Sequence, residues 1–144
     1  MAGMIDQFEA DVLDYITSGA GAGISPTNWY VALYTAAPNE DGTGGTECSA
    51  SEYQRQTMAS GDWAAAVTGQ PSTVSNSSTI TFPAATSSWG TVTHFGICSS
   101  STKGTADVQV FGALDASKAV NNGDTVSFAA SALTLQLGDP GDSY

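Results

Sequence analysis

Basic side chains are almost absent from this sequence, which has 3 Lys and Arg residues against 14 Asp and Glu residues and a formal net charge of −11. A nucleic-acid-binding surface needs clustered Lys and Arg to neutralise phosphates. Anionic membrane surfaces attract the same two residue types. We therefore expect neither nucleic acid nor a membrane as a partner. The only bases are Arg55, Lys103 and Lys118.

Residues that bind metals are equally scarce. The sequence has one histidine, His94, and two cysteines, Cys48 and Cys98, without the paired spacing of a zinc site. We predict no metal and no cofactor. Both cysteines fall in predicted strands, so we expect buried free thiols, since a reducing cytoplasm disfavours a disulfide. The acids of residues 40–52 lack the alternating pattern of an EF-hand loop, which leaves a calcium site there as an unsupported alternative.

Long apolar runs are also missing. No stretch approaches the roughly 20 residues that span a bilayer. The first 16 residues carry four acids, whereas a secretory signal begins with basic residues and an apolar run. We therefore expect synthesis in a cytoplasm.

Catalytic constellations are hard to assemble from these residues. His94 is the one imidazole base, and it lies in a predicted strand with no Gly-x-Ser-x-Gly motif nearby. The closest group of carboxylates that could hydrolyse glycosides is Glu40, Asp41, Glu47 and Glu52. Acids in turns of an acidic protein are usually solvated, so we predict that the protein is not an enzyme. Hydrolysis of glycans is therefore the least favoured of the functions that we consider.

What the sequence does contain is typical of strands and tight turns. Ser, Thr and Gly together occupy 51 of the 144 positions. Apolar residues alternate or cluster in short segments separated by turn residues, and Asn122-Gly123 predicts a hairpin across residues 118–128. We predict a mainly β protein, an antiparallel, jelly-roll-like β-sandwich with one N-terminal α-helix. The predicted strands are residues 29–34, 52–58, 79–82, 91–98, 107–114, 118–120, 125–128 and 133–137, with a partly helical segment near Trp63.

The N-terminal helix is predicted for residues 4–17, because apolar residues recur there with helical spacing. The residues of this apolar stripe are Ile5, Phe8, Val12, Tyr15 and Ile16. Gly and Ala alternate through residues 19–23, so we divide the chain into a helix with a joint (1–24) and a sandwich domain (25–144). The stripe either packs on the sandwich or docks on a partner.

A turn-rich stretch at residues 36–46 predicts a long loop, which in a compact domain is usually functional or disordered. Arg55 is expected to pair with an acid of this region. Trp63 and Trp89 are expected to anchor the core or loops, with a carbohydrate platform as the alternative.

Several ordered motifs resemble a family of small virion proteins from tailed phages. Residues 30–38 read YVALYTAAP, residues 41–47 read DGTGGTE, and related motifs stand at residues 53–56, 80–83, 86–92 and 122–128. The resemblance covers roughly residues 29–137 and leaves the N-terminal helix outside.

This resemblance implies a structural protein of the virion. Within that class we favour a capsid decoration (cement) protein, a homotrimer bound to the major capsid protein or other virion proteins. The alternative is a tail-fibre or host-recognition module that binds cell-surface glycan. The residues expected at an interface are Ile5, Phe8, Val12, Tyr15, Ile16, Glu40, Asp41, Glu47 and Arg55.

Overall fold

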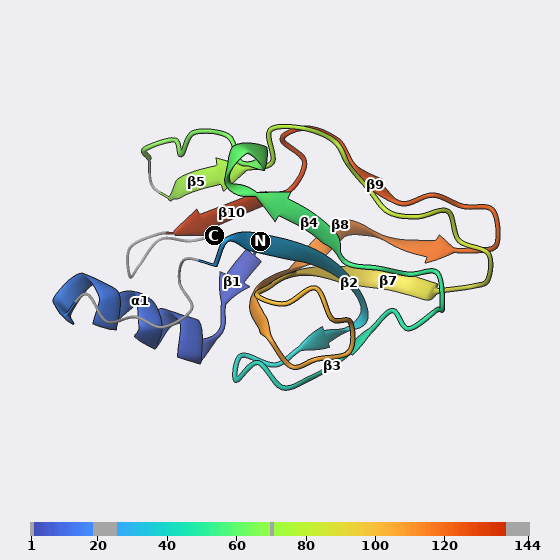
Figure 1. Ribbon diagram of the computed structural model, residues 1–144, viewed down its shortest axis with the longest axis horizontal. Helices are drawn as coiled ribbons and strands as arrows, with labels where there is room; N and C mark the ends of the chain where they lie inside the picture. The colour runs from blue at the N-terminus through green and yellow to red at the C-terminus, as the bar shows by residue number, and fades with distance from the viewer. Residues whose placement is uncertain (1, 19–25, 70, 138–144) are drawn as a thin grey trace.

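The computed structural model describes residues 2–18, 26–69 and 71–137. It is mainly β, with antiparallel sheets and one N-terminal helix, which confirms the predicted fold class (Figure 1). The elements of the described chain are β1 (Ala2–Met4), α1 (Asp6–Ser18), β2 (Asn28–Pro38), β3 (Gly44–Glu47), β4 (Gln56–Ala59), a 3-10 helix (Ser60–Asp62), β5 (Ser72–Ser75), β6 (Ile80–Thr81), β7 (Gly90–Cys98), β8 (Val108–Val120), β9 (Ser127–Phe128) and β10 (Thr134–Leu137).

The main sheet has the strand order β1-β8-β7-β2-β3, and β4 pairs with β2 on the same edge as β3. Central β2 is apolar on both faces, with Val31, Ala32 and Leu33 fully buried. A strand of this composition needs cover on each side. The sequence predicted this burial correctly.

The second layer consists of two short antiparallel ribbons, β5–β10 and β6–β9. Phe128 of β9 makes an edge-to-face contact with Phe95 of β7, with the ring centroids 6.0 Å apart. Leu133, just before β10, is buried in the same core. The ribbons and the main sheet therefore enclose a sandwich-like core.

The predicted hairpin across residues 118–128 is wrong in its pairing. Residues 118–120 are the end of the long strand β8, where Val120 pairs with Gly90, and β9 pairs with β6. The Asn-Gly turn itself does form, with Gly123 at a φ of 92°. Its backbone bonds to residue 85, since Gly123 N donates to Ala85 O at 2.7 Å. This contact directs the chain away from β8.

The predicted long loop at residues 36–46 is instead a hairpin. Strand β2 continues to Pro38, β3 begins at Gly44, and Asn39 N donates to Thr43 O at 2.8 Å to close the turn. Gly42, Gly44 and Gly45 have φ values of 65–76°, which residues with a side chain rarely adopt. Three glycines thus fit a tight turn into a stretch that resembles a flexible loop.

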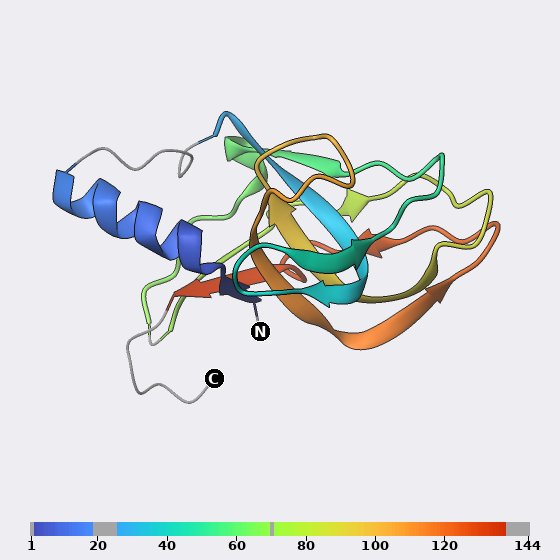
Figure 2. The ribbon, with the colours of Figure 1, turned by 90° about the horizontal axis from the view of Figure 1, so that it is seen from below.

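The helix was predicted within two residues of its actual bounds, but the strand before it was not predicted. Ala2–Met4 pairs with β8 at the edge of the main sheet, and Ile5 N donates to Gln109 O at 3.0 Å. Figure 2 shows that α1 leaves the sheet at this edge and points away from the strands. The predicted Gly/Ala joint at residues 19–23 lies outside the described residues, and the division of the chain at residues 24 and 25 stays a prediction.

Candidate functional site

The charged groups that converge in the fold form the Arg55 cluster, defined here as Glu47, Arg55 and Asp107. Arg55 is 5% exposed. Its Nε and Nη2 donate to the two carboxylate oxygens of Glu47 at 2.8 and 2.9 Å. Its Nη1 donates to the oxygens of Asp107 at 2.8 and 2.9 Å. One guanidinium thus bridges two carboxylates, and its pair with Glu47 has the bidentate geometry in which Arg binds most strongly.

The Arg55 cluster holds the β7–β8 loop (residues 99–107) onto the segment after β3. Arg55 also donates to the carbonyl oxygen of Ser100 at 2.7 Å. Gly104 N donates to Glu47 Oε2 at 2.6 Å. From the same loop, Lys103 Nζ donates to the carbonyl oxygens of Ala50 and Tyr53 at 2.6 and 2.9 Å. Two of the three cations in the sequence are therefore used to hold a loop in place.

The predicted pairing of Arg55 with an acid of this region is confirmed: the partner is Glu47, at the end of β3 and one residue beyond the predicted loop. Asp107 was missed as the second partner, because it lies 52 positions away and only the β7–β8 connection brings it close. Burial by itself lowers the pKa of Arg55, but the hydrogen bonds to Glu47 and Asp107 more than offset it and leave the pKa above its ordinary value. The guanidinium is therefore a permanent charge.

Tyr53 extends the cluster into the core. Its hydroxyl donates to Glu47 Oε1 at 3.0 Å and accepts from Leu33 N at 2.9 Å. Burial, together with the negative charge of Glu47, raises the pKa of Tyr53 far above its usual range. Tyr53 is thus a neutral donor that links the cluster to β2.

Glu52 makes a second connection that sequence reasoning missed, since it was interpreted only as a solvated acid. Its Oε1 accepts from Thr86 N at 2.9 Å, from Ser87 N at 3.1 Å and from the Trp89 indole Nε1 at 2.9 Å. The indole hydrogen bond is the largest of the causes that lower the pKa of Glu52. The carboxylate thereby fixes the loop before β7.

We expect Glu52→Gln to lower stability at neutral pH and to lose this effect in acid. A carboxyl whose folded pKa is depressed contributes stability that is present above its unfolded pKa, near 4.3, and is lost as the pH falls toward the folded value. The measurement is urea unfolding of both proteins from pH 7 to pH 3. The gap between their midpoints should be constant above about pH 5.5 and shrink below about pH 4.5. A gap of constant size at every pH would contradict the role of the charge.

Glu40 and Asp41, the other predicted interface acids, lie exposed in the β2–β3 turn, and the carboxylates that Arg55 binds are those of Glu47 and Asp107. Asp41 Oδ1 accepts from Thr43 N at 2.9 Å and from Thr43 Oγ1 at 2.6 Å, and the hydroxyl bond is the main cause that lowers the pKa of Asp41. The carbonyl oxygen of Glu40 accepts from Asp6 N at 2.8 Å. The turn therefore supports the first residue of α1, and its acidic side chains face solvent.

The apolar stripe of the helix is buried at its N-terminal end and exposed at its C-terminal end. Ile5 and Phe8 are 5% and 8% exposed, and Phe8 packs edge-to-face on Trp29 with the ring centroids 5.8 Å apart. Val12 is half-buried, whereas Tyr15 and Ile16 are 55% and 72% exposed. The first half of α1 thus packs on the protein's own sheet, and the second half presents the same stripe to solvent.

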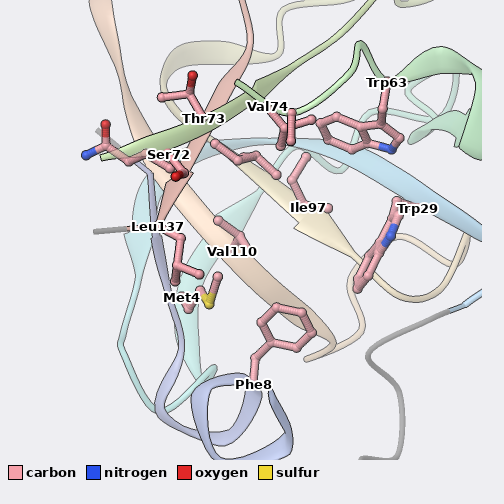
Figure 3. Close-up of a pocket in the computed structure, with 13 residues that line it drawn as sticks. Met4, Phe8, Trp29, Trp63, Ser72, Thr73, Val74, Ile97, Val110 and Leu137 are labelled. Atoms are coloured by element: carbon pink, nitrogen blue, oxygen red, sulfur yellow. The ribbon is translucent and has the colours of Figure 1, made fainter. Parts of the chain in front are cut away.

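An apolar pocket of about 420 Å³ opens beside the start of α1 (Figure 3). Met4 and Phe8 line it on one side, and Trp29 and Trp63 line it on another. Strands β5 and β10 add Val74 and Leu137, and the main sheet adds Ile97 and Val110. None of the described residues that line it is charged. The pocket therefore suits apolar side chains better than a sugar, which needs converging polar groups.

The cysteines, the histidine and Trp89 lie buried or half-buried in the fold. Cys48 and Cys98 are buried free thiols, as predicted, and burial raises their pKa values to about 11 and about 12. His94 is a half-buried strand residue whose Nδ1 lies 2.8 Å from Thr93 Oγ1. Trp89 is a core anchor, 5% exposed.

Among the described residues, no group of three or more His, Cys, Asp or Glu side chains is placed to hold a metal ion. In the same parts of the chain, no helix has the length and apolar character needed to cross a membrane.

Comparison with known families identifies a match over most of the chain. The family model described as "Podophage GP4 fiber I protein gp80" matches residues 3–136. The match begins before α1, so the expectation that the N-terminal helix lies outside the family pattern is wrong. No curated protein matches the chain.

Proposed function

Because the chain belongs to the podophage GP4 fiber I protein gp80 family, we propose that it is a non-enzymatic building block of a phage fibre. The match over residues 3–136 carries this proposal, since it includes the helix, the main sheet and both ribbons. The resemblance to phage virion proteins is confirmed. Such a protein works by binding other virion proteins, and binding to the assembled state stabilises that state.

The geometry supports a structural role. Several charged side chains hold loops against one another: Arg55, Glu47, Asp107, Lys103 and Glu52. Charged groups that are occupied in this way rigidify a scaffold. A rigid module suits a fibre, which has to transmit its shape over many copies. Glu40, Asp41 and the exposed half of α1 stay our proposed contact residues.

The matching family is described as a fibre protein, which favours the fibre over the capsid-decoration function that the sequence favoured. Decoration of the head is the second candidate, with the major capsid protein as partner. A glycan-binding role gains less support, because Trp89 is buried and Trp63 lines an uncharged pocket. The homotrimer stays a proposal for either location.

The location in the virion decides between the two candidates. We expect antibodies against this chain to label the tail end of purified particles in electron microscopy, at low copy number by quantitative mass spectrometry. Particles that lack tails provide the control and should lose the label. Label spread over the whole head at high copy number would replace the fibre with capsid decoration. A chain absent from purified particles would overturn both.

A further inference from the structure

The apolar stripe of α1 and the apolar pocket meet at Phe8. Phe8 belongs to both, since it is part of the helical stripe and also lines the pocket. Beyond it the stripe continues to Tyr15 and Ile16, and Leu13 at its border is 62% exposed. Leu137, at the pocket, is 59% exposed. The molecule therefore carries a projecting amphipathic helix, whose apolar stripe begins at the edge of an apolar hollow.

We propose that the exposed half of α1 docks into the apolar pocket of a second copy of this chain. Each copy supplies both the helix and the hollow, so the surface is self-complementary and can close with symmetry. An amphipathic helix in an apolar groove is a common mode of recognition, in which residues three and four positions apart act as anchors. Leu13 and Ile16 have this spacing.

The size and chemistry of the pocket match this occupant. Its volume of about 420 Å³ lies in the range of pockets that enclose a ligand, roughly 300–1,000 Å³. Ser72, Thr73 and Gln136 are the polar residues that line it. A helix that inserts apolar side chains leaves few hydrogen bonds unmade there, whereas a polar ligand would lose its hydration.

The charge of the chain makes a second copy distinguishable from a basic partner by the salt dependence of binding. Each chain has a formal net charge of −11, and Arg55 and Lys103 are engaged internally. Within the part of the chain that the structure describes, the residues that line the pocket are uncharged. Contact between copies is therefore apolar and works against repulsion, so added salt should strengthen it. A basic partner attracted by the acids of α1 would show the opposite salt dependence.

The first test measures the molar mass of the isolated full chain by sedimentation and light scattering, over protein concentrations and from low to high salt. We expect reversible association that tightens with salt. Leu13→Ser with Ile16→Ser should raise the dissociation constant by at least about tenfold. Ala66→Phe, which adds a ring to an exposed residue that lines the pocket, should have a similar effect. The control Val67→Ser removes an apolar side chain that is 64% exposed and does not line the pocket, and it should change nothing.

The second test identifies the contact directly. One batch carries Ile16→Cys, another carries Ala66→Cys, and the two are mixed under mild oxidation, with the native thiols buried. We expect a disulfide between the two batches that forms faster than one within either batch. Faster linking within a single batch would overturn the proposal.

A monomeric mass at every concentration would overturn it as well, and would assign the surface to another virion protein or to residues 138–144 of the same chain. Association that weakens with salt would favour an ionic contact and would also contradict the proposal. The contact does not depend on whether the chain serves in a fibre or on the head. Because the tests use the isolated chain, their failure is distinct from failure of the proposed function.

Discussion

Arg55→Met is expected to lower the free energy of unfolding by about 3–5 kcal/mol, the cost of removing one partner from a buried ion pair. The side chains of Glu47 and Asp107 are 6% and 16% exposed, so both carboxylates would remain nearly buried without their cation. The hydrogen bonds to the carbonyl oxygens of Ser100 and Thr105 would be lost as well. Urea unfolding followed by circular dichroism measures the effect as a lower midpoint.

Lys118→Met is the matched control, since it changes the net charge equally at an exposed position of β8. Its effect should stay within about 0.5 kcal/mol. Adding Glu47→Gln and Asp107→Asn to Arg55→Met should recover part of the loss, because neutral amides are cheaper to bury than unpaired charges. Equal midpoints for Arg55→Met and Lys118→Met would show that the Arg55 cluster contributes nothing to stability.

Phe8→Ala is expected to lower the free energy of unfolding by about 3 kcal/mol, at the lower end of the range for buried aromatic residues. Phe8 is 8% exposed and packs on Trp29, but one side of its ring already faces the pocket. The ring anchors α1 to the protein, so its removal should also reduce the helical signal in circular dichroism. Thermal unfolding of dilute, monomeric protein gives both readings.

Ile16→Ala is the matched control from the same helical stripe. Ile16 is 72% exposed, and Ala is the better helix former, so stability should change by less than about 0.5 kcal/mol. If both variants were destabilised to the same extent in the monomer, the outer half of α1 would also be packed, and the contrast between its two halves would be wrong.

Elements whose cause is local could be predicted from the amino-acid sequence alone. The helical spacing of Ile5, Phe8 and Val12 indicates α1, because that period places them on one face. The apolar run of β2 and the alternation in β7 likewise indicate strands, because the period of two decides which side chains face the core. The burial of Cys48 and Cys98 and the resemblance to phage virion proteins were also evident from the sequence.

Which distant segments meet could not be predicted from the sequence and is seen in the folded chain. Asp107 reaches Arg55 through the β7–β8 loop, and Glu52 reaches Trp89 across 37 positions. Residue 85 binds the turn at Gly123, so β9 pairs with β6 and not with β8. Local periodicity records how a segment is buried, whereas its partners depend on the order of the strands, which packing of the whole chain selects. For the same reason the pocket has no signature in the sequence, because β1, α1, both layers and Trp63 all contribute to its lining. The fold also determines how much of α1 packs on the sheet and how much stays exposed.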